Sequence, residues 1–125
     1  MKSKTLAQLK KDLTKVFNAY IRKRDSDGEF FTCISCGLYK PLSQMNAGHF
    51  YASTYSATRF DEDNVNGQCI ACNNFKHGNL LEYRKGLLAK IGEKRLQRLE
   101  IRKHNETRYD RGTLEILIKK YKFGG

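Results

Sequence analysis

The sequence of 125 residues has no long apolar run, and its longest apolar stretches are only a few residues. Because a membrane-spanning helix needs about 20 consecutive apolar residues, the composition excludes a transmembrane protein. The residues that follow Met1 also lack the apolar core of a secretory signal peptide. We therefore expect a cytoplasmic protein, whose cysteines are reduced or metal-bound and not joined in disulfides.

The chain also contains a single proline, and it shows no internal repeat, low-complexity tract or proline-rich linker. A length of 125 residues suits one compact domain and is too short for two separate cores. We expect a single domain over residues 1–125.

Acidic residues are scarce, with 13 Asp and Glu against 24 Lys and Arg, so the net charge is +11. Such an excess indicates a polyanionic partner, most simply nucleic acid, or else a surface that only aids solubility. The balance is +7 over residues 1–24 and +8 over residues 76–125, but −4 over residues 25–75. An acidic middle that approaches phosphates is expected to need a bound cation.

Apolar residues at helical spacing follow Thr5 and Gln8, which form a capping box, and they predict a helix over residues 5–24. We expect the apolar stripe of this helix in the core and its basic face either in solvent or against DNA. From Phe30 to Cys69 the helical period is lost, which predicts short strands and loops.

Helical spacing returns at residues 69–76 and stops at Gly78. It restarts after Asn79, a candidate cap, and predicts further helices up to residue 123. In the first of these we expect Leu80, Arg84, Leu87, Leu88 and Ile91 to share a face. Strands and helices together predict an α+β fold.

The four cysteines fall into two pairs with the Cys-x-x-Cys spacing: Cys33 with Cys36 and Cys69 with Cys72. This spacing lets a tight turn direct both sulfurs at one tetrahedral Zn²⁺ ion, and two such pairs complete a closed structural site. Four unrelated buried thiols, or a thioredoxin-like redox pair, are the weaker alternatives. We expect structural zinc, which would replace a large core in the middle of the chain.

His49 lies in the loop between the two pairs, in the stretch "QMNAGHFYAS". From its sequence alone, this histidine is a buried core residue, a metal ligand or a catalytic base. Asn73 and His77 are four residues apart and would project from one helical face, where they could hold a divalent cation. The order His49, Asn64, Asn73 and His77 resembles the HNH, or His-Me finger, nuclease motif.

A broader resemblance rests on the stretches "YIRKRD", "CISCG", "AGHF", "RFDEDNVNGQCIACN" and "HGNLLEYRKGLLAKIG". In order and approximate spacing they resemble the phage NinG family, also called Rap, whose members are recombination endonucleases acting on branched DNA. The resemblance implies a zinc-stabilised ββα-metal core over residues 30–78, flanked by the helices of residues 5–24 and 79–123.

Carried onto this sequence, the resemblance makes His49 the general base and Asn64 the residue that holds the His49 loop in place. Asn73 and His77 then become ligands of a catalytic Mg²⁺ or Mn²⁺. Many HNH nucleases have a metal-binding Asp or His directly before the base, but this chain has Gly48 there. We expect water or one of the acidic residues Asp61, Glu62 and Asp63 to complete the ligand set of the metal.

Four cations are candidates for DNA binding. Arg59 is expected either to contact a phosphate or to pair with Asp61 or Asp63, whereas Lys76, Arg84 and Lys85 would contact the DNA backbone. We expect a metal-dependent endonuclease acting on branched DNA such as Holliday junctions or D-loops. Symmetric cutting of a junction would be easiest for a homodimer. The rival hypotheses are a zinc-stabilised nucleic-acid-binding module without catalysis and a zinc-bearing protein-interaction module.

Overall fold

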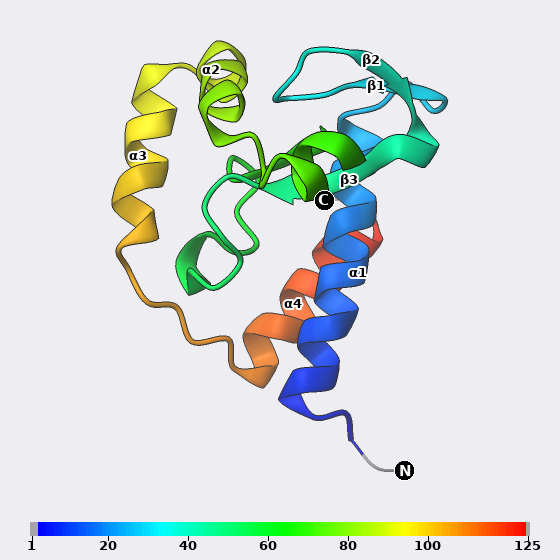
Figure 1. Cartoon of the computed structure of the whole chain (residues 1–125). Coiled ribbons are helices and arrows are strands. Elements are labelled where there is room, and N and C mark those ends of the chain that lie inside the picture. Colours follow the sequence, from blue (N-terminus) through cyan, green and yellow to red (C-terminus); the bar gives the residue numbers. More distant parts are fainter. Residues whose placement is uncertain (1–2, 125) are drawn as a thin grey trace.

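The computed structural model describes residues 3–124 and contains both helices and short strands, which confirms the α+β class. Among these residues, no helix combines the length and apolar character needed to cross a bilayer. The elements run in the order α1 (Leu6–Arg24), β1 (Phe30–Thr32), β2 (Tyr39–Pro41), η1 (Leu42–Gln44), β3 (Met45–His49), η2 (Ser56–Thr58), β4 (Val65–Cys69), η3 (Ala71–Phe75), α2 (Leu80–Ile91), α3 (Glu93–Lys103) and α4 (Arg111–Lys122) (Figure 1).

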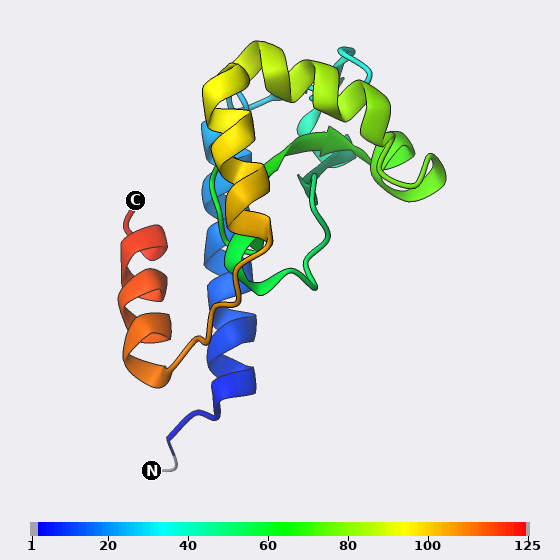
Figure 2. The same cartoon turned by 90° about the vertical axis from the view of Figure 1, so that its left-hand side faces the viewer.

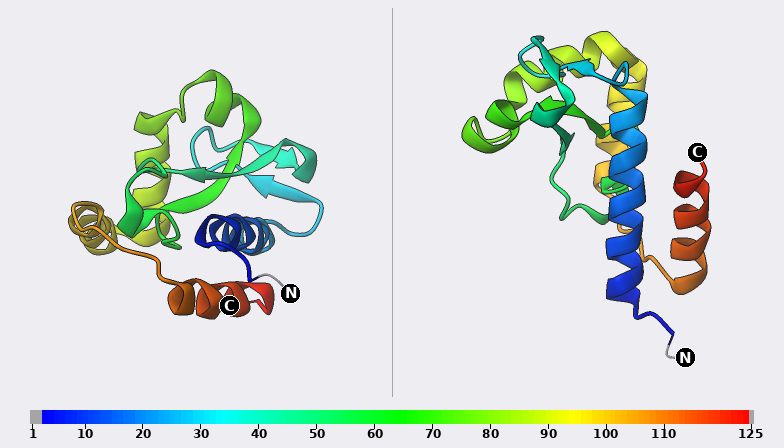
Figure 3. Two further views of the ribbon diagram at one scale, coloured as in Figure 1. Left: turned by 90° about the horizontal axis from the view of Figure 1, so that it is seen from below. Right: turned by 90° about the vertical axis from the view of Figure 1, so that its right-hand side faces the viewer.

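Helix α1 begins with the predicted capping box. The Thr5 side chain accepts a hydrogen bond from the backbone of Gln8, and the Gln8 side chain accepts one from the backbone of Thr5. Its apolar stripe packs against α4 and against the start of β4, and α1 and α4 lie side by side in Figures 2 and 3. The buried members of this cluster are Leu9, Leu13, Phe17, Ile21, Val65, Leu114 and Tyr121.

The strands form two separate antiparallel pairs, β1 with β2 and β3 with β4. In the second pair Met45 lies opposite Cys69 and His49 lies opposite Val65. The hairpin therefore places one cysteine at one end and the candidate base at the other. The loop of residues 50–64 connects the two strands at the His49 end.

The helical segment predicted over residues 69–76 is present, but it is shorter and is a π-helical turn and not an α-helix. Cys69 is the last residue of β4, and the chain then makes a single π-helical turn, η3. Gly78 ends this segment with a φ of 86°, and His77 and Asn79 also have the positive φ values of 49° and 44°. Three successive residues in this conformation cannot continue a right-handed helix.

Helix α2 has the predicted extent but a different inward face. Tyr83 and Leu87 are fully buried and pack with Leu96 and Leu99 of α3, whereas Leu80 and Leu88 are exposed. Asn79 does not cap the helix through its side chain. The predicted face included Leu87 but left out Tyr83, whose hydroxyl is satisfied inside the fold by the backbone oxygen of Gly48.

A buried ion cluster joins the end of α1 to the hairpin. Arg24 donates two hydrogen bonds to the Asp25 carboxylate, of 2.7 and 2.8 Å, and another to the backbone oxygen of Val65. Asp25 also accepts from the backbone of Gly67 and from Lys90. Burial alone raises the pKa of the Asp25 carboxyl, but the hydrogen bonds from these donors outweigh it and hold the pKa below its usual value.

We predict that Asp25→Asn lowers the free energy of unfolding by about 3 kcal/mol, because it leaves the Arg24 and Lys90 cations partly buried without their counterion. The matched control is Asp12→Asn, which removes the exposed ion pair between Lys4 and Asp12 and should cost less than about 1 kcal/mol. Urea unfolding of both variants measures the difference. Equal losses in the two variants would contradict a structural role of the cluster.

Candidate functional site

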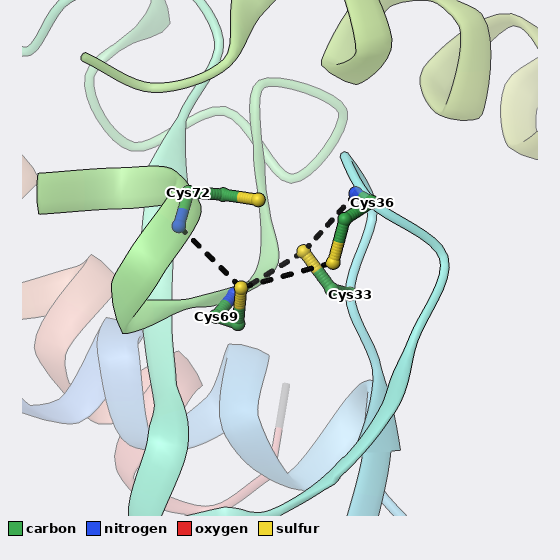
Figure 4. Close-up of side chains that lie close together, drawn as sticks. All are labelled: Cys33, Cys36, Cys69 and Cys72. Carbon is green, nitrogen blue, oxygen red and sulfur yellow. Dashed lines mark hydrogen bonds between the residues drawn. The ribbon is translucent and has the colours of Figure 1, made fainter. Parts of the chain in front are cut away.

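The four cysteine sulfurs converge on one point, as Figure 4 shows. Cys33 and Cys36 come from the turn between β1 and β2, whereas Cys69 ends β4 and Cys72 lies in η3. All four sulfurs lie within 4.8 Å of one another, and none forms a disulfide. The two Cys-x-x-Cys pairs therefore form a single cluster, as their spacing predicts.

The geometry of this cluster fits tetrahedral zinc. Zn–S bonds of about 2.3 Å place the sulfurs of a tetrahedral site about 3.8 Å apart, and the Cys36 and Cys69 sulfurs lie 3.8 Å apart. Burial raises the pKa of the Cys33 thiol, but backbone N–H groups that donate to its sulfur bring the pKa down to about 7. Burial raises the pKa of Cys72 to about 12, so metal binding must displace protons from the cluster.

His49 ends β3 and is half-buried. Its Nε2 atom lies 2.8 Å from the backbone oxygen of Arg59. Because a carbonyl oxygen only accepts hydrogen bonds, Nε2 carries the proton and Nδ1 of the neutral ring keeps its lone pair. Burial lowers the pKa of His49 below its ordinary value of 6.5, which favours the neutral ring.

Asn64 is fully buried and hydrogen-bonds three backbone groups of the loop that follows His49. Its Oδ1 accepts from the Tyr51 N–H at 2.8 Å, and its Nδ2 donates to the backbone oxygens of Tyr51 and Thr58, both at 2.9 Å. These bonds fix the loop on which Arg59 lies. Asn64 thereby sets the position of the carbonyl group that orients the His49 ring.

Tyr83 holds strand β3 next to His49, and the sequence did not single it out as a site residue. Its hydroxyl donates to the backbone oxygen of Gly48 at 2.7 Å and accepts from the Asn66 side chain at 3.2 Å. The only sequence signal for its burial is its spacing of four residues from Leu87. Helix α2 thus holds the residue next to His49.

Asn73 and His77 do not share a helical face as predicted. Asn73 lies in η3 and is partly exposed, whereas His77 lies beyond the end of this turn, in the left-handed conformation and exposed. Gly78 causes the break, because its N–H donates to the backbone oxygen of Cys72 at 2.9 Å. Both side chains belong to one short segment, but no regular helix aligns them.

The acidic residues considered as further ligands have other partners. Asp61 pairs with Arg102 at 2.7 Å, Asp63 pairs with Arg95, and Glu62 accepts hydrogen bonds from two tyrosines, Tyr20 and Tyr121. Within residues 3–124, the four cysteines are the only group of three or more His, Cys, Asp or Glu ligand atoms close enough to share a metal.

The four candidate DNA-binding cations are spread over three segments. Arg59 lies in the loop after η2, over the ring of Phe60, and Asp61 and Asp63 pair with residues of α3 and not with it. Lys76 is exposed beside η3. Arg84 and Lys85 are exposed on α2, where Lys85 lies 3.1 Å from Glu82.

We predict that the protein binds one Zn²⁺ per chain and that removing it unfolds the domain. Structural zinc contributes on the order of 10 kcal/mol, which is comparable to the whole net stability of a small domain. Elemental analysis and circular dichroism before and after chelation measure both effects. Cys69→Ser should lose the metal and Ser43→Ala should keep it, while a metal-free protein that stays folded would contradict the structural role.

The sequence of this chain matches that of a known protein family. The family model described as "Bacteriophage Lambda NinG protein" matches residues 1–124. Protein ninG of Escherichia phage 933W is 39% identical over 113 residues, which cover 89% of this chain and 53% of the relative. Protein ninG of Escherichia phage lambda is 41% identical over 101 residues, covering 79% of this chain and 47% of the relative.

Protein ninG of Salmonella phage P22 is 45% identical over 84 residues, or 66% of this chain and 39% of that protein. The chain thus spans about half the length, or less, of these curated relatives. No solved structure matches it. The match over nearly the whole chain, together with these identities, shows that the protein belongs to the NinG family of bacteriophage proteins.

Proposed function

We propose that this protein is a metal-dependent DNA endonuclease of the HNH, or His-Me finger, type, with His49 as the general base. The observation that carries the proposal is the hydrogen bond from His49 Nε2 to the Arg59 backbone oxygen. It leaves the basic lone pair on Nδ1, and the lowered pKa of the ring keeps that lone pair unprotonated at neutral pH.

In this mechanism His49 Nδ1 takes a proton from the water that attacks the scissile phosphate. The ring cannot rotate freely, because its Nε2–H is held by the Arg59 carbonyl and this carbonyl belongs to a loop that Asn64 fixes. Asn64 is therefore a positioning residue and not a catalytic one. A general base held in this way contributes about 10² to 10⁴ in rate.

The proposed ligands of a catalytic Mg²⁺ or Mn²⁺ are Asn73 and His77. Oxygen and nitrogen donors do not select zinc in the way that thiolates do, so these two residues could hold Mg²⁺ or Mn²⁺. Both residues are solvent-accessible. Since Asp61 and Asp63 are paired with arginines of α3, DNA phosphate oxygens and water would complete the coordination of an ion held by Asn73 and His77. When bound, the ion stabilises the negative charge that develops on the phosphate and the leaving oxygen.

DNA is the proposed substrate because the net charge of +11 suits a polyanion. Lys76, Arg84 and Lys85 are exposed near the proposed metal ligands and would contact phosphates, with Arg59 on the loop beside His49. The preference for branched recombination intermediates, and action in the cytoplasm of the bacterial host cell, rest on the likeness to the NinG family. Symmetric cutting of a four-way junction would be easiest for a homodimer.

We predict that purified protein cuts labelled four-way junctions with Mg²⁺ or Mn²⁺ and that His49→Ala lowers the cleavage rate at least 100-fold. His104→Ala is the matched control, because His104 is exposed at the end of α3 and should leave the rate unchanged. Single-turnover assays on junction, flap and linear duplex measure the effect. A wild type that binds all three and cuts none would instead support a non-catalytic, zinc-stabilised binding module.

We also predict a simple pH dependence. The cleavage rate should rise as His49 loses its proton and then level off, with the midpoint below pH 6.5 because burial lowers the pKa of the ring. Rates measured between pH 5 and 8 test the midpoint, and ¹⁵N nuclear magnetic resonance tests the same pKa and the Nε2–H tautomer without DNA. A midpoint above pH 7 by both methods would exclude His49 as the base in this environment.

A further inference from the structure

The two most exposed large apolar side chains among the described residues are Leu81, at 80%, and Phe75, at 79%. Single exposed apolar residues are common, but these two belong to one protruding segment, which runs from η3 into α2 and projects at the right of Figure 2. Leu80 and Leu88 are also exposed on α2. The segment thus displays apolar surface that the fold leaves uncovered.

The backbone of this segment is tied to the buried part of the molecule. The Gly78 N–H donates to the Cys72 oxygen at 2.9 Å, and the Gly78 oxygen accepts from the buried Gln68 side chain. The Asn79 side chain donates to the Cys72 sulfur at 3.5 Å. Because these contacts fix the turn to the cysteine cluster, Phe75 cannot become buried through a local collapse of the chain.

The turn also stores backbone strain. His77 and Asn79 have positive φ values of 49° and 44°, which cost energy for residues other than glycine and are concentrated at functional sites. A rigid, strained turn that carries an exposed aromatic ring is already organised for binding, since little conformational entropy is lost when a ligand covers the ring.

Cations lie close in sequence to each of the two apolar side chains, together with one acid, Glu82, which pairs with Lys85. Lys76 follows Phe75 directly, and Arg84 and Lys85 lie three and four residues after Leu81, which places them beside it on the surface of α2. All three are exposed. A surface that combines an aromatic ring with several cations is complementary to a nucleic acid, in which flat bases lie next to phosphates.

We propose that Phe75 and Leu81, the apolar tip, bind DNA bases that are unstacked at a branch point. Phe75 stacks on an exposed base and Leu81 fills the adjacent step, while Lys76, Arg84 and Lys85 contact the flanking phosphates. An intact duplex must first be unstacked to admit the tip, whereas a junction already offers open base faces. The proposal deepens the proposed nuclease function, since Asn73 and His77 lie on either side of Phe75 in the chain.

Fluorescence anisotropy with labelled four-way junction and matched linear duplex tests the proposal, in Ca²⁺ buffer, with a gel confirming that the DNA stays intact. Phe75→Ala should raise the Kd for the junction about tenfold and the Kd for the duplex less than threefold. Phe123→Ala is the matched control, because Phe123 is 75% exposed at the end of α4, and it should change neither Kd. Phe75→Trp should keep the affinity for the junction.

A second pair of variants and a second signal separate stacking from general damage. Leu81→Ala should weaken junction binding, whereas Ile116→Ala, at an exposed position on α4, should not. A 2-aminopurine base at the branch should change in fluorescence on binding wild type and lose that change with Phe75→Ala. The salt dependence of the Kd should be unaltered, because no phosphate contact is removed.

Equal weakening of junction and duplex binding by Phe75→Ala, or no weakening, would overturn the proposal. A loss of self-association with unchanged DNA binding would also overturn it and assign the tip to a contact between two copies. If wild type gives the 2-aminopurine signal but never cuts with Mg²⁺ or Mn²⁺, the tip stands and the nuclease function fails. If wild type binds no DNA, both fail.

Discussion

The cluster of four sulfurs constrains the middle of the chain more than any other interaction. Three of the five buried residues in the surrounding apolar cluster are its own cysteines, Cys33, Cys69 and Cys72. A metal held by them would join the β1–β2 turn to the end of β4 and to η3. Since β4 pairs with β3 in a fixed register, the same constraint places His49 at the opposite end of the hairpin.

The acidic middle of the chain is neutralised within the fold by cations from its basic flanking segments. From the sequence, the acidic residues 25–75 were expected to need a bound cation before they could approach phosphates. The structure instead pairs four of these acids with Arg and Lys residues, all from the basic flanking segments; the acids are Asp25, Asp61, Glu62 and Asp63. Part of the basic excess therefore stabilises the fold, which leaves fewer cations, among them Arg84 of α2, for the proposed contact with DNA.

Local signals predicted the parts of this protein that depend on local contacts. The capping box of Thr5 and Gln8 and the Cys-x-x-Cys pairs act over three or four residues, and both were predicted correctly. The helical segment of residues 69–76 was predicted to end at Gly78, as it does, but its start was misplaced because the pairing of Cys69 with Met45, a long-range contact, makes Cys69 the last residue of β4. Tyr83 was missed for a related reason, since its role depends on meeting Gly48, 35 residues away.

The side chain of Gln68 links Gly48 to the strained turn at His77. A Cβ atom at Gly48 would lie 2.1 Å from Oε1 of Gln68, so no metal-binding side chain fits there while Gln68 keeps its position. Gln68 is fixed because its Nε2 donates to Ser35 and to the Gly78 oxygen, which can only accept. The space that a side chain before His49 would need is thus filled by a buried amide, which also holds the turn at His77. The ligand that many HNH nucleases carry directly before the base therefore has no room at Gly48, and the ligands proposed above, Asn73 and His77, lie instead in and after η3.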